Sequence, residues 1–405
     1  MENQIKIRRY EFDWLRVLAF SLLIFYHTGM YFVSWDWHVK NPVISQTLEV
    51  PMIFMSQWRM SLIFLVSGVG VYFALGFRSA GTFAKDRLKR ILLPLVIGML
   101  LVVPPQVYFE RAVQGTATDY LSFYPSVFEF EPYPEGNFSW HHLWYLTYIF
   151  CYSLLLLPLL VYLRSASIHA AGIQNWMLLA VPALWLSIGG ILLNERFPAT
   201  NALVDDWANH FLYITVFLIG FLLMKLPQLQ EKVRQVRWFS LSLAAATLAI
   251  LYSFYWFKDI DLGGMELTTY YVLKQSNRWF WLMVILGFAM QHLNLKNKYL
   301  TQANEMVYPF YILHQTVIVA LGYYLLQSDW SISLKFFIIS LSTFFICFLL
   351  IKYLIMPVNW LRLPFGLKPI KKRETQHSLG LHAPKIKKRS LSLAIKKIQK
   401  EVFTR

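Results

Sequence analysis

Long apolar runs recur along this chain from Trp14 almost to Met356, and they limit its fold more than any other feature. Most of them reach the roughly 20 residues that a helix needs to cross a bilayer. The chain is 57% hydrophobic and only 15% charged over 405 residues, whereas a soluble chain of this length would divide into domains with polar surfaces. We therefore predict an all-α integral membrane protein, a bundle of about ten transmembrane helices. The expected spans are 14–34, 52–77, 91–110, 139–163, 174–193, 207–224, 238–257, 269–293, 305–326 and 333–356.

Positive charge is concentrated in alternate loops and in the C-terminal tail. The formal net charge is +16, a value that is also typical of nucleic-acid-binding proteins. Here, however, the basic loops alternate with loops that carry most of the acids, such as Glu129, Glu131 and Asp205. This is the positive-inside pattern of a multi-pass membrane protein. It predicts both termini in the cytoplasm, contact with membrane lipid and no nucleic-acid partner.

The composition changes where the last apolar run ends. We predict a transmembrane domain over 1–356 and a basic cytoplasmic tail over 357–405. Apolar residues from Leu391 to Val402 recur on one helical face of the tail. This pattern fits an amphipathic helix on anionic lipid, and a solvated tail is the alternative. The longest outer loop, 111–138, is acidic and aromatic, and we expect it to pack over the membrane domain.

Motifs of several common site types are absent from the sequence. The two cysteines, Cys151 and Cys347, lie inside apolar runs, so they indicate neither a disulfide framework nor a metal-type spacing. There is no convincing glycine-rich phosphate loop, HExxH zinc motif or GxSxG nucleophile elbow. The sequence therefore predicts no bound metal, and attention turns to ionisable residues inside the membrane domain.

Arg16 and His27 stand eleven residues apart in the first predicted helix. At about 100° per residue, this spacing returns the two side chains to one face, with a rise of about 16 Å between them. That face carries a fixed positive charge near the cytoplasm and an imidazole toward the outer half of the membrane. The arrangement suits acyl transfer to a hydroxyl, because an arginine can hold the phosphates of a thioester donor while a histidine acts as general base.

Structural interpretations compete with these assignments. Arg16 can snorkel to the interface and pair with Asp13, and His27 can be a structural histidine hydrogen-bonded between helices. Histidines and tryptophans of the outer loops, such as His38 and Trp144, can belong to the interfacial aromatic belt.

Arg59 lies inside the second predicted helix, well away from either end. A lone arginine at that depth must face the bundle interior and find a partner. It can stabilise the oxyanion of a tetrahedral intermediate or hold a carboxylate on the acyl group. Otherwise it forms a buried ion pair, for which the nearby acids are Asp36, Glu49 and those of the outer loop 111–138.

Several further stretches follow Arg16 and His27 in order along the chain. They are Trp58-Arg59-Met60 with Phe64 to Gly68, Asp86 to Arg90 running to Pro94, and Tyr308 to Gln315. Together with the first-helix spacing they resemble the acyltransferase-3 family of integral membrane acyltransferases. The likeness covers nearly the whole chain, to about Met356. Trp37-His38-Val39 and His142 to Leu146 resemble the branch that contains a succinyltransferase of periplasmic glucans.

The resemblance implies a role for most of the singled-out residues. His27 would be the catalytic base, and Arg59 is the second candidate catalytic residue. The residues expected to bind the donor, acetyl-CoA or succinyl-CoA, are Arg16, Arg87 and Arg90. The residues expected on the side of the carbohydrate acceptor are His38, His142, Trp144 and His314. For His314, a polar network inside the core is an equally good interpretation.

We therefore expect O-acyl transfer from cytoplasmic acyl-CoA to a hydroxyl of an extracytoplasmic carbohydrate, by a multi-pass protein of the cell inner membrane. The alternative is a transporter or flippase for a glycan or a lipid-linked saccharide, because buried charges serve transport as well. The lack of an internal repeat in the sequence disfavours that alternative.

Overall fold

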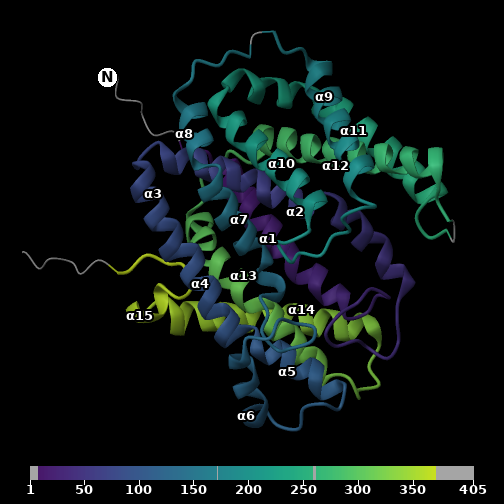
Figure 1. Ribbon diagram of the computed structural model, residues 1–405, viewed down its shortest axis with the longest axis vertical. Coiled ribbons are helices and arrows are strands. Elements are labelled where there is room, and N and C mark those ends of the chain that lie inside the picture. Colours follow the sequence, from purple (N-terminus) through teal and green to yellow (C-terminus); the bar gives the residue numbers. More distant parts are fainter. Residues whose placement is uncertain (1–7, 171, 259–260, 371–405) are drawn as a thin grey trace, which may run out of the picture. The chain divides into compact units, whose positions relative to one another are not determined.

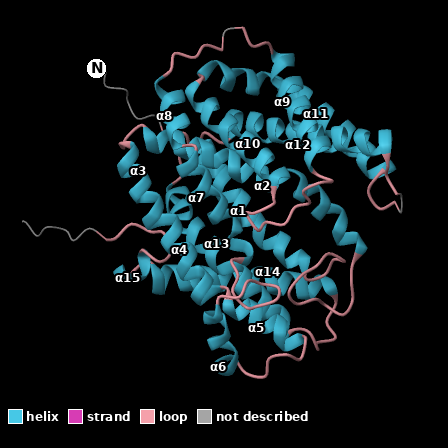
Figure 2. Cartoon of the chain, viewed as in Figure 1, coloured by secondary structure: helices cyan, strands magenta, loops and turns pink. Residues whose placement is uncertain are grey.

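The computed structural model describes residues 8–170, 172–258 and 261–370, and within these ranges the regular structure is entirely helical (Figure 2). The α-helices labelled in Figure 1 are α1 Tyr10–Met30, α2 Gln46–Leu75, α3 Ala80–Arg87, α4 Leu93–Ile97, α5 Pro104–Val113, α6 Tyr120–Phe123, α7 Trp144–Leu155, α8 Leu157–Ser165, α9 Asn175–Leu193, α10 Trp207–Lys225, α11 Pro227–Phe254, α12 Gly264–His292, α13 Lys298–Tyr324, α14 Ile332–Leu349 and α15 Asn359–Arg362. The π-helical turns are η1 Leu88–Leu92, η2 Gly98–Val102 and η5 Leu350–Ile355, and the 3₁₀ turns are η3 Tyr124–Glu129 and η4 His141–Leu143.

Each predicted span overlaps one or more of these helices. Among the residues that the structure describes, seven helical stretches are long and apolar enough to cross a membrane, or eight if the bent pair α7–α8 is one span. The protein is therefore an all-helical, multi-pass membrane protein, as predicted, although its composition supports fewer spans than ten. α1 and α12 are not among the seven, and both carry charged side chains within the helix, Arg16 in α1 and Arg278 in α12.

Prolines alter two of the predicted spans. The third span, predicted over 91–110, is longer: it belongs to a helical stretch of 34 residues that begins at Ala80 and runs to Val113. Its π-helical turns, η1 and η2, end shortly before Pro94 and Pro104. Because proline lacks an N–H and its ring crowds the preceding turn, the helix widens there. The fourth span bends by 57° between α7 and α8, where Pro158 lies in the first turn of α8.

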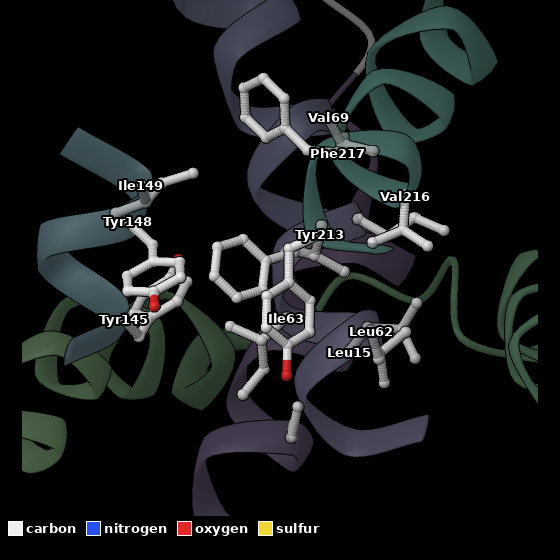
Figure 3. Close-up of a cluster of buried hydrophobic side chains, with 14 of the residues drawn as sticks. Leu15, Leu62, Ile63, Val69, Tyr145, Tyr148, Ile149, Tyr213, Val216 and Phe217 are labelled. Atoms are coloured by element: carbon white, nitrogen blue, oxygen red, sulfur yellow. The ribbon is translucent and has the colours of Figure 1, made fainter. Parts of the chain in front are cut away.

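α1 packs chiefly against α13 and α2, and α2 packs along α10. Figure 3 shows the buried side chains where α1, α2, α7 and α10 meet: Leu15, Leu62, Ile63, Val69, Tyr145, Tyr148, Ile149, Tyr213, Val216 and Phe217. The face of α1 that carries Arg16 and His27 is thus held among neighbouring helices.

Two glycines let α2 and α10 approach closely. A Cβ added at Gly68 would lie 1.9 Å from the carbonyl oxygen of Phe217, and one added at Gly220 would lie 2.0 Å from the carbonyl oxygen of Leu65. Small residues at such contacts are typical of helix pairs in membranes, where tight packing replaces the hydrophobic effect as the source of association.

We expect Gly68→Ala to destabilise the protein by about 1–3 kcal/mol, because the obstructing atom belongs to the backbone and cannot rotate away. Thermal unfolding in detergent, followed by tryptophan fluorescence, should show a lower midpoint. Gly81→Ala is the matched control, since a Cβ there meets nothing within 4 Å. An unchanged midpoint for Gly68→Ala would show that α2 and α10 can separate freely.

Basic loops that are distant in sequence meet at one end of the bundle. Arg9 Nη1 donates to Gln230 Oε1 over 2.5 Å, and Lys225 Nζ donates to the carbonyl oxygen of Arg164 over 2.7 Å. These contacts join the N-terminal segment, the α10–α11 turn and the end of α8. The predicted grouping of the basic loops on one side therefore agrees with the fold.

The segments outside the long helices pack on the bundle. In the loop after α5, Phe123 and Val127 are buried in the main core, as the sequence led us to expect. The compact unit continues to Pro369, past Met356, and Arg362 Nη2 pairs with Glu305 Oε1 at 2.8 Å. The predicted amphipathic face of the tail, from Leu391 onward, lies outside the described residues.

Candidate active site

The three arginines predicted to bind the donor line one cavity of about 330 Å³. Arg16 reaches it from α1, Arg87 from the end of α3 and Arg90 from η1. The other hydrogen-bonding side chains of its wall are Ser67, Tyr145, Asn304 and Tyr308. Three cationic side chains that converge on one cavity suit a polyanionic ligand.

Arg16 is held by α13 rather than by its neighbour in the first helix. Its Nη1 donates to Asn304 Oδ1 over 3.3 Å, and Asn304 Nδ2 donates to Asp13 Oδ1 over 2.9 Å. Asp13 forms its ion pair with Arg8, at 2.7 Å. Asn304 thus stands between Arg16 and Asp13, and no carboxylate neutralises the Arg16 guanidinium directly among the described side chains.

Two polar groups at this cavity are buried and have no hydrogen-bond partner within the described part of the chain. They are Nε of Arg87, whose guanidinium lies over the Phe83 ring at 4.4 Å from its centroid, and the hydroxyl of Tyr308. A buried donor without a partner costs roughly 1–3 kcal/mol. A ligand that accepts from both groups would recover this cost, which marks the cavity as a binding site.

The predicted base, His27, forms a hydrogen-bonded pair with His314 of α13. Nδ1 of His27 lies 2.8 Å from Nε2 of His314, and Nδ1 of His314 lies 2.7 Å from the carbonyl oxygen of Tyr311. The two rings are stacked with an interplanar angle of 17°. One carbonyl therefore sets the proton positions in both rings.

The hydrogen-bond network assigns the tautomers as follows. A carbonyl oxygen only accepts, so His314 carries its proton on Nδ1 and keeps a lone pair on Nε2. His27 must then donate from Nδ1, which leaves the lone pair of the neutral imidazole on Nε2. That atom makes no hydrogen bond to another described residue. The arrangement presents His27 Nε2 as a proton acceptor and orients it through His314.

Arg59, on α2, lies within electrostatic range of both His27 and His314. Its guanidinium carbon is 3.3 Å from the centroid of the Tyr26 ring, a cation–π contact. The side chain is buried, and Nε and Nη1 have no hydrogen-bond partner in the described ranges.

The acidic partner suggested for Arg59 by the sequence is not found. Glu49 accepts a hydrogen bond from the backbone N–H of Ser34 at 2.8 Å, and Asp36 is exposed. No carboxylate of the described residues forms an ion pair with Arg59, so the alternative of a buried ion pair is not what the fold contains. A buried guanidinium with two N–H positions that have no protein acceptor is suited to an anion that arrives with the substrate.

Three aromatic rings separate the arginine cavity from the histidine pair. The ring of Phe20 lies 6.2 Å from that of Tyr145 and 5.4 Å from that of Tyr311, and the two tyrosine rings lie 5.8 Å apart. Phe20 and Tyr145 line the cavity, whereas the carbonyl of Tyr311 holds His314. We call these three residues the ring partition. Neither His27 nor His314 lines the cavity.

A second polar cluster lies beside His27 on the other side from the cavity. The Trp37 ring is 5.4 Å from the His27 ring and 5.0 Å from the His38 ring. Nδ1 of His38 donates to Glu110 Oε2 at 2.6 Å, and Tyr133 OH donates to Glu110 Oε1 at 2.8 Å. Burial, together with the hydrogen bond from Tyr133 to Glu110, raises the pKa of Tyr133, so its phenol stays protonated.

Of the two other residues predicted for the acceptor side, His142 lies inside the bundle and Trp144 is half-buried at the start of α7. His142 is buried, with Nε2 donating to the carbonyl oxygen of Ile312 at 3.0 Å, and its ring packs against His314 at 5.3 Å. Trp144 packs against Phe64 and Tyr213, away from the histidines. The fold thus brings His27, His38, His142 and His314 together but leaves Trp144 apart.

Comparison with known proteins agrees with this geometry. Residues 9–352 match the family described as "Acyltransferase domain", the acyltransferase-3 type. The chain belongs to this acyltransferase family. It is therefore a membrane acyltransferase that transfers groups other than aminoacyl groups, and a transporter without such activity is disfavoured.

Curated relatives resemble the acyltransferase over part of its length. It is 27% identical over 142 residues to the glucans biosynthesis protein C of Escherichia coli strain SMS-3-5 / SECEC, and 26% identical over 142 residues to that of strain K12. These alignments cover 34% of this chain and 35% of each relative, so the chain spans about a third of the relatives it matches. No solved structure matches it.

Glu110 and Asn304 were not predicted for the acyltransferase's site. Tyr308, Tyr311 and Gln315 belong to the stretch that resembles the family, but no role was predicted for them. Glu110 was detectable in principle, because an acid at the end of an apolar run is itself a functional signal. The two tyrosines and Asn304 carry no such signal, since polar and aromatic side chains are common in membrane helices.

Proposed function

We propose that this acyltransferase moves an acyl group from acyl-CoA on the cytoplasmic side to a hydroxyl of a carbohydrate on the other side of the cell inner membrane. One observation carries the proposal. Arg16 and His27 of α1 lie on either side of the ring partition, Arg16 in the cavity with the two other arginines and His27 in the pair with His314. The arginines suit the phosphates of coenzyme A, and the free Nε2 of His27 suits a hydroxyl proton.

The donor would enter where the basic loops gather, which the positive-inside pattern assigns to the cytoplasm. Arg16, Arg87 and Arg90 would bind its phosphates, and Nε of Arg87 and the Tyr308 hydroxyl would gain the acceptors they lack. The pantetheine arm would carry the acyl group past the ring partition.

The acceptor would approach from the side of Trp37 and His38. His27 Nε2 would take the proton of the attacking hydroxyl as its oxygen adds to the thioester carbon. Arg59 would stabilise the resulting oxyanion with its unpartnered N–H groups. Collapse of that intermediate re-forms the carbonyl double bond and breaks the carbon–sulfur bond, which leaves the new ester, and the proton held by His27 passes to the departing thiolate. His314 would keep His27 in the required tautomer.

Inverted membrane vesicles, which expose the cytoplasmic face, test the proposal directly. Supplied with labelled acetyl- or succinyl-CoA and loaded with periplasmic glucan, they should transfer label to the carbohydrate. Vesicles of the opposite orientation, given the donor outside, should not. Label that stays on the donor in both preparations, with the protein present and folded, would overturn the proposal.

A second prediction concerns the binding of acyl-CoA in the donor cavity. Arg87→Ala should raise the KM for acyl-CoA by about ten- to a hundredfold, because a hydrogen bond to a charged group contributes about 1.5–3 kcal/mol. Its KM for acyl-pantetheine, which lacks the nucleotide phosphates, should stay unchanged. Lys89→Ala is the matched control, since Lys89 is exposed and does not line the cavity. Equal effects on both donors would place the phosphates elsewhere.

A further inference from the structure

The cluster beside Trp37 has the composition of a metal site. His38, Glu110 and His141 each offer one ligand atom, and these atoms all lie within 4.8 Å of one another. The residues come from three separate elements: the loop after α1, the helix α5 and the turn η4. Two imidazoles and one carboxylate form a donor set that suits Zn²⁺, with a fourth position left open.

The hydrogen bonds of the cluster leave a place for a cation. His38 Nδ1 now shares a proton with Glu110 Oε2 at 2.6 Å, and a metal ion would replace that proton. Nε2 of His141 is buried and has no hydrogen-bond partner in the described residues. The His38 and His141 rings are stacked with centroids 4.2 Å apart. Ligand atoms around a tetrahedral Zn²⁺ stand about 3.3 Å apart, so small side-chain rotations would close the site.

Each of the three prospective ligand residues also makes a hydrogen bond through an atom that would not bind the metal. Tyr133 OH donates to the second carboxylate oxygen of Glu110 at 2.8 Å, and Nδ1 of His141 lies 2.8 Å from Ser139 Oγ. The remaining nitrogen of His38, Nε2, lies 3.2 Å from the Gln315 side-chain amide. Partners of this kind orient metal ligands and are a regular part of metal sites. A simple ion pair between His38 and Glu110 would not require His141 to be fixed in the same way.

The backbone supports the same interpretation. His141 has a φ of 38°, in the left-handed region that non-glycine residues seldom adopt. This conformation directs the ring toward His38 and Tyr133, whose ring lies 4.9 Å away. Such local strain persists where the surroundings over-determine it, often at a ligand site.

We propose that His38, Glu110 and His141 bind one divalent transition-metal ion, Zn²⁺ in particular, one indole ring away from His27. The open fourth position would take a water molecule or a hydroxyl of the acceptor. This site is separate from the donor cavity and from the histidine pair.

Metal content and a spectroscopic probe test this inference without reference to activity. Full-length protein purified in detergent from zinc-supplemented cells, without chelators, should hold about one equivalent of zinc by elemental analysis. After removal by a chelator, added Co²⁺ should give the visible absorption of a nitrogen- and oxygen-ligated ion, and added Zn²⁺ should raise the midpoint of thermal unfolding.

Variants then locate the ion. His141→Ala and Glu110→Gln should lose the zinc and the stabilisation by added Zn²⁺, while His169→Ala, at an exposed histidine, should keep both. His27→Ala should keep the zinc, which separates this cluster from the histidine pair. Folded wild-type protein that contains no zinc and gives no Co²⁺ absorption would overturn the inference. That result would leave the proposal of acyl transfer standing, because the transfer mechanism depends on His27, Arg59 and the arginine cavity.

Discussion

Replacing His27 by alanine should reduce acyl transfer by about 10²- to 10⁴-fold, the range that a positioned general base contributes. The structure leaves Nε2 of His27 with a free lone pair and fixes its orientation through His314, and no other described side chain stands in that position. The rate should be measured as label moved from acyl-CoA to carbohydrate, divided by the amount of folded protein in the membrane. The KM for acyl-CoA should change little, because His27 does not line the donor cavity.

Two companion variants define how this result is interpreted. His169→Ala, at an exposed histidine, should leave the rate unchanged. His314→Gln should lower the rate less than His27→Ala, since His27 would remain but could adopt either tautomer. Full activity of a folded His27→Ala protein would exclude the proposed mechanism.

Arg59→Ala should lower kcat by about 10²- to 10³-fold, as expected when one donor to a developing oxyanion is lost. Arg59 is buried beside the histidine pair with two N–H positions free, so its loss removes charge stabilisation at the reacting carbon. Arg59→Lys should recover only part of the rate, because an ammonium group cannot reproduce the planar set of donors.

Arg164 provides the control for Arg59. It stacks on Tyr72 with its guanidinium carbon 4.5 Å from the ring centroid, yet it lies at the end of the bundle where the basic loops meet. Arg164→Ala should therefore change the thermal midpoint and the amount of protein rather than kcat. If Arg59→Ala affected only those same quantities, its role would be structural.

The sequence was most informative within single elements. The spacing of Arg16 and His27 predicted a shared face of α1, and Arg87 and Arg90 were expected to act together. The fold places Arg16 at the donor cavity and His27 against His314, and it brings Arg87 and Arg90 to the same cavity. Helical periodicity is enough for the shared faces, because it depends only on residues close in the chain, whereas the expectation that all three arginines bind the donor came from the family resemblance.

Contacts between distant elements could not be derived in this way. His38 and Glu110 are 72 residues apart, and His141 follows another 31 residues later, so nothing in the local sequence joins them. Glu49 was a plausible partner for Arg59 by depth in the membrane, but tertiary packing directs it to the backbone of Ser34 instead. Trp144 was expected beside the acceptor histidines, but it packs against Phe64 instead.

The ring partition has an electrical consequence. If its two substrates arrive from opposite faces of an energised membrane, as we propose, the enzyme could become a conduit for protons and ions, and each elementary charge that crosses releases about 2.3 kcal/mol per 100 mV. The packed rings of Phe20, Tyr145 and Tyr311 would oppose a continuous file of water between the arginine cavity and His27. In the proposed mechanism only the slender pantetheine arm and its acyl group would displace these rings, so acyl transfer would proceed without discharging the gradient on which the cell depends.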